Sequence, residues 1–255
     1  MGERTSYPPG TFSWAELATS DAGAAKSFYS TLFGWDYEDN PIGDGQVYSM
    51  ALRDGKHVAA LFGSAEPPHW NCYVTVASVD EATTRAGELG GTVMAEPFDV
   101  MDAGRMSVIA DPTGAALCLW EPRSHIGASL VNTPGALTWN DLVTPDPEAA
   151  ATFYGALFGW TTEEMPDAGG YRVIRNGERS NGGIMPLDPD RMGPETPPSW
   201  MPYFGHQDVG RLVNEVGGLG GQVFNGPVSV PAGTFAVLGD PQGAVFAVLS
   251  GQYDD

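Results

Sequence analysis

The chain carries one pattern twice, 125 residues apart. Residues 14–35 read WAELATSDAGAAKSFYSTLFGW, and residues 139–160 read WNDLVTPDPEAAATFYGALFGW. The identical positions include Trp14, Phe28, Tyr29, Leu32, Phe33, Gly34 and Trp35, each with its copy 125 positions later. Because chance does not keep so many residues in register, we interpret the pattern as an internal duplication. A chain of 255 residues is long enough for two ordinary domains, one for each copy.

The repeated stretch predicts a strand followed by a helix. Residues 11–19 alternate as expected for a half-buried strand. Asp21 is a typical helix N-cap, and Gly34 supplies a left-handed stop after a run of apolar residues at helical spacing. In the second copy, Asp146 and Pro147 occupy the matching helix start. Each half therefore opens with the same strand and helix.

Short strands follow, and the pattern restarts midway through each half. Hairpin turns are predicted at Asp54-Gly55 and Asn176-Gly177. A second strand and helix begin near residues 70 and 200, and Asp-Pro-x-Gly turns at 111–114 and 240–243 precede the last strands. These repeats predict an α+β fold of four βαβββ modules. We predict a first domain over residues 10–122, a linker over 123–136 and a second domain over 137–251.

The net charge disfavours some classes of binding partner, and the cysteine content disfavours a disulfide-stabilised fold. The 32 acidic and 12 basic residues give a formal net charge of −20, which repels phosphate backbones and anionic lipid. We therefore expect neither nucleic acid nor membrane as a partner. Cys72 and Cys118 make no disulfide framework, and no run reaches the roughly 18 apolar residues of a membrane span. We expect a cytoplasmic monomer or homodimer, loosely ordered only at residues 1–9 and 252–255.

The motif D-x-x-x-A-x-x-F-Y-x-x-L-F-G-W after a first strand, with D-P-x-G before a last one, resembles the vicinal oxygen chelate superfamily. That group holds glyoxalase I, extradiol dioxygenases, fosfomycin-inactivating enzymes and bleomycin-sequestering proteins. The likeness runs from residue 11 to residue 250, and the tandem form is similar to a bacterial glyoxalase-like branch. The resemblance implies two glyoxalase-like domains, in which modules pair into curved, mixed eight-stranded sheets that each enclose a cup-shaped cavity.

The metal enzymes of this superfamily take His or Glu ligands from cup-facing positions on the first, fourth, fifth and last strands of a domain. The corresponding positions here hold Trp14, Trp139, Asn71, Met201, Cys118 and Ala247, and the fourth strands show no carboxylate at a ligand position. Trp, Met and Ala do not bind a hard or borderline divalent ion. The four histidines, including His125 in the linker, show no recognised ligand spacing. The resemblance thus predicts the fold without its usual metal ligands, and we predict no cofactor, with a divalent metal as the alternative.

Two carboxylates take equivalent places in the two copies. Glu16 and Asp141 lie two residues after Trp14 and Trp139, so strand parity puts each on the same face as its tryptophan. A carboxylate facing an aromatic cavity has its pKa raised by desolvation, as a general base often requires. It could instead hold a cationic or hydrogen-bonding ligand, or be structural polarity that accepts from a neighbouring strand or indole. We take Glu16 and Asp141 as the candidate catalytic residues.

The same parity gives the candidate ligand-binding residues. These are Trp14, Asn71, Tyr73, Cys118, Trp139 and Tyr203. Aromatic side chains there can stack on a planar ligand, although packing within the core would explain them equally well. We predict a small-molecule-binding protein, such as one that sequesters an antibiotic or metabolite. The alternative is a glyoxalase-like lyase, isomerase or hydroxylase acting on a small carbonyl or aromatic compound, with Glu16 or Asp141 as the base.

Overall fold

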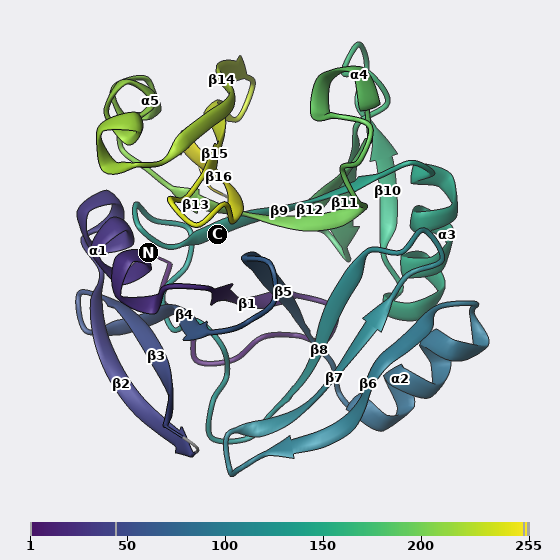
Figure 1. Ribbon diagram of the computed structural model, residues 1–255. Coiled ribbons are helices and arrows are strands. Elements are labelled where there is room, and N and C mark those ends of the chain that lie inside the picture. Colours follow the sequence, from purple (N-terminus) through teal and green to yellow (C-terminus); the bar gives the residue numbers. More distant parts are fainter. Residues whose placement is uncertain (1, 44, 252, 254–255) are drawn as a thin grey trace.

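Two eight-stranded mixed sheets make up the computed structural model, which describes residues 2–43, 45–251 and 253 (Figure 1). The first sheet has the order β2-β3-β4-β1-β5-β8-β7-β6, and the second has the order β10-β11-β12-β9-β13-β16-β15-β14. The predicted α+β class with four βαβββ modules is confirmed. Modules one and two share the first sheet, and modules three and four share the second, which settles a pairing that the sequence leaves open.

The elements have the following bounds. The first sheet contains β1 (Phe12–Thr19), β2 (Asp36–Gly43), β3 (Gln46–Arg53), β4 (Lys56–Gly63), β5 (His69–Thr75), β6 (Thr92–Val100), β7 (Gly104–Ala110) and β8 (Ala116–Pro122). The second contains β9 (Leu137–Thr144), β10 (Thr161–Glu164), β11 (Arg172–Asn176), β12 (Arg179–Pro186), β13 (Ser199–Gly205), β14 (Gln222–Val230), β15 (Gly233–Gly239) and β16 (Val245–Gly251). The helices are α1 (Ala22–Phe33), α2 (Val79–Glu88), α3 (Pro147–Phe158), α4 (Pro189–Met192), α5 (Val209–Glu215) and the 3₁₀ turn η1 (Val216–Leu219).

The first helix of each half begins and ends where the sequence predicts. Asp21 accepts a hydrogen bond from the Ala24 amide at 2.9 Å, and Asp146 accepts one from the Ala149 amide at 3.0 Å. Gly34 follows α1 with φ 68°, in the left-handed region that glycine adopts without strain. These local signals fix the helix ends independently of the rest of the fold.

The predicted βαβββ modules imply the outer strands β2, β6, β10 and β14, but the sequence pattern gives no residue ranges for them. Each lies at a sheet edge, and β2 (DYEDNPIG) and β10 (TTEE) bury none of their side chains. A strand exposed on both faces needs no alternation of apolar residues, and charge and proline are common at edges. The missing pattern is therefore a consequence of the edge position.

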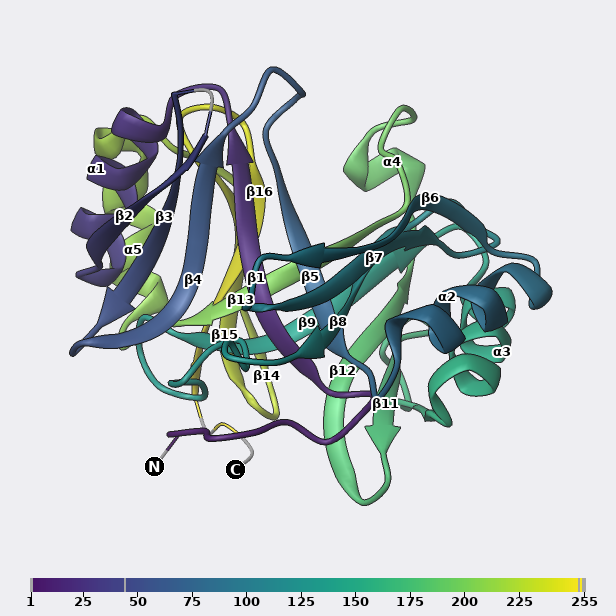
Figure 2. The same ribbon diagram turned by 90° about the horizontal axis from the view of Figure 1, so that it is seen from below.

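The helices pack across the two halves. In both views α1 lies beside α5 of the second half, and α2 lies beside α3 (Figures 1 and 2). Between the sheets, Trp70 meets Phe204 with ring centroids 5.0 Å apart, and Phe12 meets Trp200 at 4.9 Å. Trp70 and Phe204 sit on the strand faces opposite to Asn71 and Tyr203. The sheets thus pack back to back, and the faces that carry the candidate site residues point away from each other.

A buried hydrogen-bond chain joins the two repeated motifs across this boundary. The Trp70 indole donates to the Tyr29 hydroxyl at 3.3 Å, and that hydroxyl donates to Asp240 Oδ2 at 3.1 Å. Asp240 belongs to the Asp-Pro-x-Gly turn of the other half. The equivalent chain starts in the second half, where the Trp200 indole donates to the Tyr154 hydroxyl at 2.9 Å. Asp111 of the first half lies beside that hydroxyl. Each first-module helix is thereby tied to the last turn of the opposite half.

The linker and the N-terminal segment run together along the first sheet. The Arg4 amide donates to the Ser129 carbonyl at 3.0 Å, and the Ala128 amide donates to Ser13 at 2.7 Å. The Tyr7 hydroxyl donates to the Ala128 carbonyl at 2.6 Å. The expectation of a loose N-terminus is therefore wrong for residues 2–9, whereas residues 1, 252, 254 and 255 lie outside the described residues. No helix within the described ranges has the length and apolar character needed to cross a membrane.

Candidate functional site

Strand register gathers the predicted residues of the first half on one face of the first sheet. Trp14 lies opposite Tyr73, and Glu16 lies opposite Asn71 across the β1–β5 pair. Cys118 on β8 pairs with Tyr73. Because directly opposed residues point to the same side of a sheet, all five share the face turned away from the second half. We call this face the first cup.

Glu16 is the centre of a hydrogen-bonded group in the first cup. Its Oε1 accepts from the Tyr73 hydroxyl at 2.6 Å and from the Asn71 amide at 3.3 Å, and its Oε2 accepts from the Tyr48 hydroxyl at 2.8 Å. The Trp14 indole donates to Tyr48 at 3.2 Å. Burial raises the pKa of Glu16, and the three donors offset only part of that shift. Three of about four carboxylate acceptor positions are thus filled.

The second half repeats this arrangement on the matching face of the second sheet, which we call the second cup. Asp141 Oδ2 accepts from the Tyr203 hydroxyl at 2.6 Å. Its Oδ1 accepts from the Tyr171 hydroxyl at 2.8 Å and from the Trp139 indole at 2.9 Å. Desolvation raises the pKa of Asp141, against the opposing effect of these donors. Both copies therefore hold one buried carboxylate between two phenols, with an indole alongside.

Sequence reasoning missed Tyr48 and Tyr171. They are 123 positions apart, so the 125-residue offset of the first strand and helix does not align them. The hairpin turns at Asp54-Gly55 and Asn176-Gly177 are 122 apart, and aligning on these turns would have brought the two tyrosines within one residue. In the second cup the space for Tyr171 depends on Gly183, because a Cβ there would overlap the Tyr171 hydroxyl and Asp141.

His125 of the linker is a second contact that the sequence did not predict. Its ring meets the Trp14 ring edge-on at 4.7 Å, and its carbonyl accepts from the Trp120 indole at 2.9 Å. Its Nε2 is buried without a hydrogen-bond partner. Burial, with His57 nearby, lowers the pKa of His125 to about 4. The linker thus places a neutral imidazole against the floor of the first cup.

Acidification should weaken the wild-type fold through His125. Its folded pKa lies below the ordinary value of 6.5, so its stabilising contribution is complete above pH 6.5 and is lost as the pH falls through 4. We expect wild type to lose about 2–3 kcal/mol relative to His125→Gln between pH 7 and pH 4. Urea unfolding of both proteins at the two pH values measures this. Glu16 and Asp141 titrate in both proteins, so their effects on stability cancel in the difference between wild type and His125→Gln. Equal losses of stability in the two proteins would contradict the assignment of the effect to His125.

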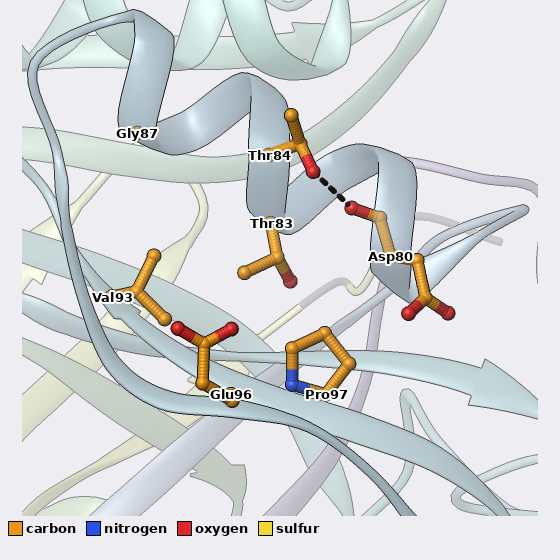
Figure 3. Close-up of a pocket in the computed structure, with 7 residues that line it drawn as sticks. All are labelled: Asp80, Thr83, Thr84, Gly87, Val93, Glu96 and Pro97. Atoms are coloured by element: carbon orange, nitrogen blue, oxygen red, sulfur yellow. Dashed lines mark hydrogen bonds between the residues drawn. The ribbon is translucent and has the colours of Figure 1, made fainter.

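Two hollows lie outside the cups. A pocket of about 320 Å³ between α2 and β6 is lined by Asp80, Thr83, Thr84, Gly87, Val93, Glu96 and Pro97 (Figure 3). One of its two carboxylates, Asp80, is already paired with Arg105 at 2.7 Å. A wider groove of about 550 Å³ runs between α1 and α5, where Arg53 donates to the Phe33 carbonyl and Arg211 pairs with Glu215. Asp80, Arg53 and Arg211 are thus committed to neighbours, and among the described residues neither hollow gathers a group of free charged side chains.

Three kinds of similarity to known proteins agree with the fold. The family described as a glyoxalase-like domain matches residues 14–120 and 138–249. A protein named "Putative glyoxylase CFP32" in Mycobacterium tuberculosis is 46% identical over 259 residues, covering 98% of this chain and 98% of that protein. The anthracycline biosynthesis protein DnrV of Streptomyces peucetius is 32% identical over 265 residues, covering 96% of this chain and 94% of that protein.

Solved structures share the arrangement of the two sheets. The Mn(II)-bound glyoxalase from Novosphingobium aromaticivorans has a TM-score of 0.69 at 17% identity, covering 96% of this chain and 84% of that one. The 2,3-dioxygenase LapB from Pseudomonas sp. KL28 also has a TM-score of 0.69, at 14% identity, covering 96% of this chain and 94% of that one. At these identities the likeness concerns the fold alone.

The metal of the manganese-bound neighbour does not fit the side chains found here. In residues 2–43, 45–251 and 253, no three His, Cys, Asp or Glu side chains gather closely enough to hold a metal ion. In each cup the carboxylate is engaged by phenols instead, and Trp14 and Trp139 stand where the resemblance implies a first-strand ligand. Protonated phenols and indoles donate hydrogen bonds and offer a divalent ion no ready ligand.

Proposed function

Because the chain belongs to the glyoxalase-like domain family, we propose that it binds a small planar organic molecule in its cups. The observation that carries the proposal is the repeated buried carboxylate between two tyrosines, set in an apolar face. Residues 10–122 and 137–251 would form the two binding domains, joined by the linker. The ligand is a free small molecule, in keeping with a net charge of −20 that disfavours nucleic acid and anionic membranes.

The side chains around each carboxylate suit a flat apolar ligand. Half-buried apolar residues of the first cup are Tyr48, Met50, Phe62, Met106 and Val108, and those of the second are Trp139, Met185, Phe235, Val237 and Leu249. Aromatic rings stack on planar ligands, and methionine adapts its shape to them. Binding sites for small molecules are typically such apolar surfaces with a few fixed polar groups.

The polar group of each cup indicates a ligand that donates a hydrogen bond or carries positive charge. Glu16 and Asp141 each accept three hydrogen bonds, which leaves about one acceptor position for a hydroxyl or ammonium group. Relatives covering nearly the whole chain are named for anthracycline biosynthesis. An anthracycline, which is planar and bears hydroxyl and amino groups, is therefore the first probe to use.

Titration of the protein with an anthracycline, followed by the ligand's fluorescence, tests the proposal. We expect saturable binding of one or two molecules per chain. The control is Leu219→Ala, a substitution on the helix side of the second sheet, which should leave the affinity unchanged. Native mass spectrometry of the same samples gives the stoichiometry, any metal carried and whether the protein is a monomer or a homodimer. A linear, unsaturable signal with the anthracycline and with a panel of smaller aromatic amines and phenols would rule the proposal out.

A second function, proton transfer, is favoured by the raised pKa of both carboxylates. A carboxylate with a raised pKa is a stronger base, and adjacent phenols can stabilise negative charge that develops on a substrate oxygen. The name of the Mycobacterium relative, a glyoxylase, points to an enzyme of small carbonyl compounds. Exchange of a substrate C–H proton with deuterium from solvent would reveal this activity. Glu16→Gln or Asp141→Asn should abolish it, and unchanged exchange in both variants excludes the two residues as bases.

A further inference from the structure

The two cups differ in what covers the indole on their floors. In the first cup the His125 ring lies against Trp14, which is only 3% exposed. The apolar linker residues Ala128, Leu130 and Val131 join the same cluster as Trp14, Tyr73 and Cys118. The floor of the first cup has therefore become part of the main hydrophobic core, and the chain itself supplies the covering ring.

In the second cup the equivalent indole has no such cover. Trp139 is half-buried, and no aromatic or imidazole ring of the described residues stacks against it. Met201, Tyr203 and Ala247 form a small cluster separate from the main core, with Trp139, Phe235, Val237 and Leu249 half-buried around them. Half-buried apolar side chains around a few fixed polar groups are typical of a surface on which a small molecule packs.

The two indoles share a polar contact to a tyrosine as well as equivalent places in the sequence. The Trp14 indole nitrogen donates to Tyr48, and the Trp139 nitrogen donates to Tyr171 at 3.0 Å and to Asp141 at 2.9 Å. Both rings are thus held with the nitrogen toward the carboxylate and tyrosine group. Because the rings are fixed in the same way, a partner that suits one suits the other.

We propose that the second cup is the binding site, and that the ligand seats a planar nitrogen-containing or hydroxyl-bearing aromatic ring on Trp139, in the place that His125 takes on Trp14. The first cup is occupied by the chain's own imidazole and takes no ligand. This inference rests on the proposed function and assigns it to one cup. The imidazole, which meets Trp14 edge-on, shows that a ring can occupy this place. The remaining acceptor position of Asp141 lies on Oδ2, where a ring N–H or O–H donor would bind.

Indole N–H signals in nuclear magnetic resonance distinguish the cups directly. The chain has 7 tryptophans, and the variants Trp139→Leu and Trp14→Phe identify the two signals that matter. On titration of wild type with the anthracycline, the Trp139 signal should shift in a saturable way while the Trp14 signal stays in place. Trp139→Leu and Phe235→Ala should each weaken binding at least tenfold, since both remove walls of the second cup.

The variant His125→Gly supplies the matched test in the first cup. Removal of the imidazole should open a site on Trp14, so that free imidazole shifts the Trp14 signal in this variant and not in wild type. Saturable binding that moves the Trp14 signal in wild type, or that survives Trp139→Leu and Phe235→Ala within twofold, overturns the assignment to the second cup and leaves the proposed function intact. Absence of saturable binding to wild type removes both.

Discussion

Replacing Phe204 by alanine should lower the free energy of unfolding by about 3–5 kcal/mol. Phe204 is fully buried, and its ring lies 5.3 Å from Phe33 and 5.0 Å from Trp70 of the first half. The substitution removes apolar contacts and leaves a cavity where the two sheets pack back to back. Urea unfolding at neutral pH measures the loss.

The matched control for this prediction is Phe224→Ala on the outer strand β14. Phe224 is 55% exposed, so the same chemical change should cost less than about 1 kcal/mol. Comparable losses in the two variants would show that the boundary between the halves contributes no more stability than an edge strand does, against the packing described here.

Replacing Asp240 by alanine should cost a similar amount, about 3–5 kcal/mol, for a polar reason. Asp240 Oδ1 accepts from the amides of Gln242, Gly243 and Ala244, and its Oδ2 accepts from the Tyr29 hydroxyl. Loss of the carboxylate leaves these donors without their acceptor in a site where Asp240 is 2% exposed. Thermal or urea unfolding of the variant at pH 7 gives the cost.

Tyr29→Phe separates the two parts of this effect. It removes only the hydroxyl that links the halves and keeps the turn bonded to Asp240, so we expect a loss of about 1–2 kcal/mol. A loss in Tyr29→Phe as large as that in Asp240→Ala would mean that the bond between halves, and not the turn, carries the stability. A negligible loss in both variants would contradict the whole hydrogen-bond chain.

The features that the sequence predicts well are those decided by neighbours along the chain. The caps Asp21 and Asp146 and the repeated apolar spacing act within one helix, and they place α1 and α3 correctly. Strand parity is equally local, and it put Glu16 and Tyr73 on one face, where they are hydrogen bonded at 2.6 Å. Duplication then extends each of these inferences to the second half.

The features that it misses depend on register or on contacts between distant segments. Tyr48 on β3 reaches Glu16 because β3 pairs with β4 and β4 pairs in parallel with β1, with Ala60 opposite Glu16. No local pattern encodes these registers. His125 meets Trp14 because the linker folds back along the first sheet. Outer strands such as β2 escape detection because an exposed edge imposes no apolar alternation.

The connectivity of a fused pair gives a duplicated protein a way to acquire two unlike sites. Two separate copies of a single domain would present identical surfaces, and any change in one would appear in the other. A fused pair needs one join, and the length of that join need not be shared equally between the two domains. Here residues 123–131 lie on the first, bringing His125 to Trp14 while Trp139 stays half-buried. The halves are thus made different by the path of the backbone, before any divergence in the residues of the sites themselves.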